Sequence, residues 1–191
     1  MYRDRLASLI VFLVVLSPTI GSAAQLPATL KVGEQELKLN GVGEREKLFL
    51  DLYVAGLYLT ELSNESKTIV DADAPMALRI AITSKMVSQE KLIASLQEGF
   101  QNSTQGKLEP IREEIQKFRE CFSDEISRGN VFDLVYLPNQ GVMVFKDGKR
   151  KGIVAGLEFK QALFGIWLCD RPVDADLKQA LLRGDSDSRR R

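Results

Sequence analysis

The segment 46–59 constrains the fold of this chain most, because its hydropathy alternates with a period of two. Its even positions make one apolar face: Leu48, Leu50, Leu52, Val54 and Tyr58. Its odd positions mix Asp51 and Tyr53 with Phe49 and Leu57, and Arg45 just upstream has the same parity. Such alternation is typical of a β-strand. We expect one face to meet the core and the mixed face either to line a ligand cavity or to lie in solvent.

The remaining pattern predicts further strands and amphipathic helices within one domain, residues 25–184. The expected strands lie in the hairpin 29–39 and at residues 76–83, 131–137, 142–145 and 153–154. The expected helices lie at residues 65–70, 88–100, 108–122, 159–167 and 174–182. Helices and strands are grouped separately along the chain, and no internal repeat is visible. This segregation indicates an α+β fold.

The absence of histidine excludes several classes of chemistry. The 191 residues contain 26 basic, 26 acidic and no histidine residues. Catalysis by Ser-His-Asp or Cys-His groups and zinc or haem ligation by histidine are therefore excluded. A balanced charge also argues against a nucleic-acid partner. With no C-x-x-C motif either, we expect no metal and no cofactor.

The N-terminus is typical of a secretory signal peptide. Arg3 and Arg5 precede the apolar run 6–16, and the small residues 22–24 follow. We expect cleavage near Ala24 and export to the periplasm or the medium, with an uncleaved anchor as the alternative. The run is short for a membrane span of roughly 20 residues, so we expect no stable span after cleavage. Residues 1–24 form the signal peptide in this interpretation, and the polar residues 185–191 form a disordered tail.

Two cysteines, Cys121 and Cys169, follow the expected signal peptide. An oxidising compartment would permit a disulfide between them. Buried free thiols that pack as small apolar side chains are the alternative. Spacing alone does not decide between the two states.

Several motifs together resemble one known family. They are Leu39–Arg45 (LNGVGER), Leu52–Leu59 (LYVAGLYL), Leu137–Pro138, Ala162–Leu168 (ALFGIWL) and Pro172–Asp174. Residues 28–184 resemble the chalcone isomerase-like family, in particular its bacterial exported branch, which is related to chalcone isomerase-fold fatty-acid-binding proteins. The resemblance implies a large antiparallel sheet with a layer of α-helices on one face, an open-faced sandwich with a ligand cleft between the layers.

The resemblance also implies roles for individual residues. Arg45 matches the family arginine that holds an anionic ligand group, and Tyr53 matches a tyrosine of the fatty-acid-binding branch where the isomerases carry threonine. A surface ion pair of Arg45 and ordinary strand packing of Tyr53 are the alternatives. Apolar side chains that we expect to contact the ligand tail are Phe49, Leu57, Leu96, Phe100, Ile166 and Trp167.

The isomerase positions fit this sequence badly. Ser88 stands where the isomerases have a catalytic tyrosine, Ser95 where they have asparagine, and Ile166–Trp167 replace a threonine-methionine pair. We therefore expect an exported, non-catalytic protein that binds a small amphipathic carboxylic acid, in particular a fatty acid. The alternative is an isomerase, an intramolecular lyase of the chalcone isomerase type, acting on a phenolic or enone substrate through Arg45 and Tyr53. The sequence does not identify a protein partner.

Overall fold

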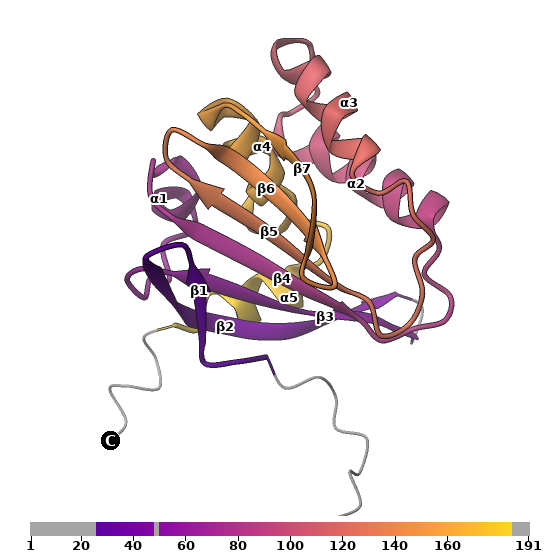
Figure 1. The fold of residues 1–191 in the computed structure, drawn as a ribbon, viewed down its shortest axis with the longest axis horizontal. Coiled ribbons are helices and arrows are strands. Elements are labelled where there is room, and N and C mark those ends of the chain that lie inside the picture. The colour runs from indigo at the N-terminus through magenta and orange to yellow at the C-terminus, as the bar shows by residue number, and fades with distance from the viewer. Residues whose placement is uncertain (1–25, 48–49, 185–191) are drawn as a thin grey trace, which may run out of the picture.

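A seven-stranded antiparallel sheet is the framework of the molecule, and its strands lie in sequence order from β1 to β7 (Figure 1). The computed structural model describes residues 26–47 and 50–184. The expected signal peptide, residues 1–24, the expected tail, residues 185–191, and Phe49 lie outside the described residues. The strands are β1 (Thr29–Val32), β2 (Gln35–Lys47), β3 (Leu50–Leu59), β4 (Met76–Ile82), β5 (Val131–Leu137), β6 (Gly141–Lys146) and β7 (Lys149–Val154).

The helices follow β3, β4 and β7 in the chain. They are α1 (Ser66–Asp71), α2 (Gln89–Ser103), the 3-10 turn η1 (Glu109–Ile111), α3 (Arg112–Glu120), α4 (Leu157–Leu168) and α5 (Ala175–Leu181). Ser88 and Asp174 cap α2 and α5, because their side chains accept hydrogen bonds from the backbone N–H groups of Lys91 and Leu177. Figure 1 shows α4 and α5 behind the sheet in the chosen view. The α+β prediction is thus confirmed.

The prediction of a single strand over residues 46–59 is wrong at its N-terminal end. Glu46 and Lys47 belong to β2, and β3 begins at Leu50 after a very short connection. The alternation of side chains runs on across this connection, and Leu48–Phe49 contains none of the residues that usually mark a turn. The hairpin is therefore invisible in the hydropathy pattern, and Arg45 and Tyr53 lie on neighbouring strands instead of on one.

Both faces of the sheet bury apolar side chains. Tyr53 and Leu57, on the odd face of β3, belong to the main core between the sheet and the helices. Tyr58, on the even face, belongs to a smaller cluster on the opposite side, and its hydroxyl donates a hydrogen bond to the Pro27 carbonyl at 2.9 Å. The mixed odd face of β3 is therefore the one that the helices cover.

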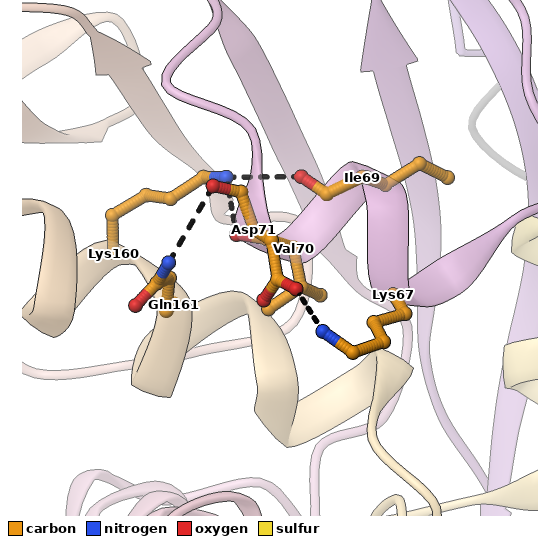
Figure 2. A network of polar contacts seen from close by, with 6 residues as sticks. All are labelled: Lys67, Ile69, Val70, Asp71, Lys160 and Gln161. Carbon is orange, nitrogen blue, oxygen red and sulfur yellow. Dashed lines mark hydrogen bonds and ion pairs between the residues drawn. The ribbon is translucent and has the colours of Figure 1, made fainter.

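A buried lysine holds α1 against α4. Lys160 is 0% exposed, and its ammonium group donates hydrogen bonds to the carbonyls of Ile69, Val70 and Ala72 at 2.7–2.9 Å. Figure 2 shows the contacts with Ile69 and Val70. These carbonyls belong to the last turn of α1 and the residue after it, which have no partner inside the helix. Burial lowers the pKa of Lys160 to about 8. The ammonium group thus caps a short helix from a distant part of the chain.

The last helix packs on β2. The Asn40 side-chain amide donates hydrogen bonds to the carbonyls of Leu181 and Ser63 at 2.8 and 2.9 Å. Next to it, a Cβ on Gly41 would lie 2.2 Å from the carbonyl oxygen of Ala180. Glycine at position 41 therefore allows α5 to approach the strand that carries Arg45.

We predict that Lys160→Met lowers the free energy of unfolding by about 2 kcal/mol or more, because three buried carbonyls lose their partner. Lys67→Met on α1 is the control, since Lys67 is exposed and forms its ion pair with Asp71, one turn away on the same helix. Its effect should stay within about 0.5 kcal/mol. Urea denaturation measures both values, and equal effects would contradict the capping role of Lys160.

We predict that Gly41→Ala lowers the free energy of unfolding by about 2 kcal/mol, because its methyl group collides with the α5 backbone. Val42→Ala is the control, as Val42 is 43% exposed. It should cost at most about 1 kcal/mol. Thermal unfolding followed by circular dichroism compares the two, and an unchanged midpoint in Gly41→Ala would mean that α5 has room to move.

Candidate functional site

Arg45 and Tyr53 lie side by side because β2 and β3 pair in a specific register. Arg45 is directly opposite Tyr53, and the pairing shifts by one residue immediately afterwards, between Arg45 and Glu46. Directly opposed residues of an antiparallel pair are close enough for their side chains to interact. The guanidinium carbon of Arg45 lies 5.7 Å from the centre of the Tyr53 ring. The pairing brings a cation and a phenol together under α2.

The guanidinium group of Arg45 is buried without an opposite charge. Arg45 is 9% exposed. Its Nη1 donates a hydrogen bond to Ser95 Oγ of α2 at 2.8 Å, and none of the ion pairs among the described residues includes it. Burying a charge is costly unless an opposite charge or enough hydrogen bonds compensate. The group is thus poised to pair with an anion.

Tyr53 is fixed from the opposite side by the indole of Trp167. Trp167 Nε1 donates a hydrogen bond to the Tyr53 hydroxyl at 2.9 Å, and Tyr53 is 3% exposed. Burial raises the pKa of Tyr53, and the charge of Arg45 and the Trp167 hydrogen bond oppose this rise without cancelling it. The phenol is therefore neutral at neutral pH and carries a proton that it can donate.

A cavity of about 450 Å³ opens beside these groups, between β3 and the N-terminal half of α2. This volume is within the range of small-molecule sites. Arg45, Tyr53 and Ser95 supply polar groups in its wall. The other lining residues are Lys47, Leu52, Met86, Val87, Lys91, Leu92, Ala94 and Glu98. The apolar part of the wall suits an amphipathic ligand, and three of the four charged lining residues, Arg45, Lys47 and Lys91 against Glu98, favour an anion.

The structure places most of the expected tail contacts elsewhere. Leu57, Leu96, Phe100 and Ile166 are buried in the main core and do not line the cavity. The Phe100 ring packs instead on Phe118 and Phe159, at centroid distances of 6.0 and 5.9 Å. Trp167 reaches the site only through Tyr53. Phe100 instead lines a separate cavity of about 900 Å³, between α2 and α3.

The sequence interpretation missed the residues of α2 that face the cavity. Lys91, Ser95 and Glu98 are spaced by four and three residues, so they lie on one side of the helix. This polar stripe next to Leu92 was the available signal. Leu52, Met86 and Val87 carry no such pattern, because Met86 and Val87 lie in the irregular segment between β4 and α2.

The two cysteines are free thiols in this structure. Cys121 is buried beneath β7, where a Cβ on Gly152 would lie 2.5 Å from its Sγ, and burial raises the pKa of its thiol. Cys169 directly follows α4. Across residues 26–47 and 50–184, no group of three or more acidic, cysteine or histidine side chains has the arrangement of a metal site. In the same part of the chain, no helix has the length and apolar character needed to span a bilayer.

Comparisons with known proteins place this geometry in context. A family model described as chalcone isomerase-like matches residues 21–183. No curated protein shows significant sequence similarity to the chain. Among solved structures, a fatty-acid-binding protein from Arabidopsis thaliana superposes with a TM-score of 0.69 at 21% identity, over 83% of this chain and 91% of the plant protein. At this identity the likeness concerns the fold.

We predict that Arg45→Met leaves the free energy of unfolding of the ligand-free protein unchanged or raises it, because an uncompensated buried charge is removed. Arg79→Met is the matched control, since Arg79 forms two hydrogen bonds to Asp133 at 2.6 and 3.0 Å. The control should lose about 2 kcal/mol or more, because Asp133 loses its partner. Urea denaturation of both variants tests this contrast. An equal loss of unfolding free energy in both variants would mean that an anionic group of the protein pairs with Arg45 and stabilises the fold.

Proposed function

The chain belongs to the chalcone isomerase-like family, and from this premise we propose that it is a non-catalytic protein that binds a small amphipathic carboxylic acid, specifically a fatty acid. One observation carries the proposal: the buried, unpaired guanidinium group of Arg45 at the wall of an apolar cavity. A carboxylate would supply the missing opposite charge.

The head group of the acid binds at Arg45, Tyr53 and Ser95 in this proposal. A guanidinium group presents parallel N–H donors that match the two oxygens of a carboxylate. The Tyr53 hydroxyl adds a neutral donor next to them. Ser95 already accepts from Arg45 Nη1 and keeps the guanidinium in place. The fold has already removed most of the water around the Arg45 guanidinium group. The carboxylate would displace the little that remains.

The apolar tail lies against Leu52, Val87 and Leu92 and reaches the opening near Met86, which is 51% exposed. An apolar ligand portion would shield these side chains from water, which favours binding in proportion to the area covered. The name of the Arabidopsis structural neighbour, a fatty-acid-binding protein, supports a lipid ligand.

Binding is favoured over the isomerase alternative by the state of Tyr53. A proton carrier works best when its pKa lies near the operating pH. Burial moves the pKa of Tyr53 upward, away from neutrality. Tyr53 is therefore suited to donate a hydrogen bond and poorly suited to exchange a proton with a substrate. We also propose that residues 1–24 direct export, to the periplasm or the medium, and are then removed.

We predict that an organic extract of the purified protein contains a stoichiometric fatty acid, and that this acid is absent from Arg45→Ala/Tyr53→Phe. The double variant loses both the charge and the hydroxyl that hold the carboxylate. Mass spectrometry of the extracts identifies the acid. The intact mass of the protein recovered after expression of the full chain shows whether cleavage occurs near Ala24.

Arg128→Ala serves as the matched control, because Arg128 is an exposed arginine that does not line the cavity. It should retain the acid. Equal lipid in the wild type and the double variant, or a wild type that contains no acid and takes up neither octanoate nor palmitate in calorimetry, would refute the carboxylate site.

A further inference from the structure

The hydrogen bond between Trp167 and Tyr53 has a defined direction. An indole N–H can only donate, so the 2.9 Å contact runs from Trp167 Nε1 to the Tyr53 oxygen. The Tyr53 proton consequently cannot point at Trp167. The cationic neighbour of Tyr53, Arg45, is also exclusively a donor. No hydrogen bond from the Tyr53 hydroxyl to an acceptor is present within residues 26–47 and 50–184.

We propose that Trp167 is a positioning residue that fixes the polarity of the Tyr53 hydroxyl, so that its proton is presented to an anionic ligand bound at Arg45. This inference rests on the proposed function. Trp167 does not line the cavity. It acts through Tyr53. The Tyr53 oxygen accepts the hydrogen bond of Trp167, and the Tyr53 proton is then available to the ligand in the cavity.

The surroundings of Trp167 hold this arrangement in place. Trp167 is 3% exposed on α4, within the main core. The preceding residue, Ile166, packs so closely on α2 that a Cβ on Gly99 would lie 2.5 Å from its Cγ2. The helix that carries the indole therefore has little room to shift relative to α2, which carries Ser95. The donors around the cavity are fixed before a ligand arrives, which reduces the entropic cost of binding.

The arrangement also determines which ligands bind. Arg45 offers only donors, Tyr53 offers the proton of a hydroxyl whose oxygen already accepts from Trp167, and an ionised carboxylate presents only acceptors. An amide of the same length keeps one acceptor oxygen but replaces the other oxygen by an NH2 donor group, which would face a donor of the protein. The site should therefore separate a carboxylic acid from its amide more sharply than the charge of Arg45 alone would.

The test is a double-mutant cycle with octanoate and octanamide as probes. Calorimetry measures both ligands on the wild type, Trp167→Phe, Tyr53→Phe and the double variant. Trp167→Phe should weaken octanoate binding about tenfold, the scale of one hydrogen bond to a charged group, and should leave octanamide nearly unchanged. In the Tyr53→Phe background the same substitution should change octanoate affinity less than twofold, because Trp167 acts through the missing hydroxyl.

Phe164→Leu is the control for loss of volume in α4, because Phe164 is equally buried and has no polar contact. It should leave the ratio of octanoate to octanamide affinity unchanged. A second measurement needs no ligand. Trp167 is the only tryptophan of the chain, so a single indole N–H resonance reports on the bond. Tyr53→Phe should shift this resonance and speed its exchange with solvent.

Three results would overturn the proposed role of Trp167. A loss of octanoate affinity on Trp167→Phe that is equal in both backgrounds would show that Trp167 only supports the packing, and would overturn the inference while leaving the proposed function intact. An indole resonance that Tyr53→Phe does not move would also overturn it. A wild type that binds neither octanoate nor palmitate would refute the proposed function and this inference together.

Discussion

The register between β2 and β3 is the constraint on which the site depends. It sets Arg45 opposite Tyr53. The register shifts at Asn40 and after Arg45 allow the longer strand β2 to pair with the shorter strand β3. A slip by one residue would turn every side chain of a strand to the other face of the sheet. Arg45 would then lie in solvent, and the cavity beneath α2 would lose its charge. The pairing of β2 with β3 is therefore part of what forms the binding site.

Two buried cations in this fold have opposite surroundings. The three N–H groups of Lys160 all donate to carbonyls at the end of α1, so none is left for a ligand. Arg45 has five donors, of which Nη1 donates to Ser95 Oγ, and none of the ion pairs among the described residues includes it. The first arrangement joins two helices, whereas the second leaves capacity for a ligand. Burial alone does not distinguish them; the number of unused donors does.

Local signals in the sequence predict the elements well but predict the site only in part. Helix caps at Ser88 and Asp174 and the Asp147–Gly148 turn are local, and the structure contains each of them. The proximity of Arg45 and Tyr53 was expected from shared parity on one strand, yet it arises from pairing between two strands. Hydropathy cannot separate a core residue such as Phe100 from a cavity residue such as Leu92, because both are apolar and only the packing of distant segments decides which space stays empty.

The contact between α5 and β2 has a consequence for the order of events during folding. Asn40 and Gly41 meet the backbone of residues 180 and 181, at the opposite end of the domain sequence. Contacts between distant parts of a chain form late, because closing a long loop costs entropy before the contact is rewarded. During synthesis β2, the strand that bears Arg45, cannot pack against α5 until α5 has left the ribosome. The binding site is thus completed only when the whole domain has been made.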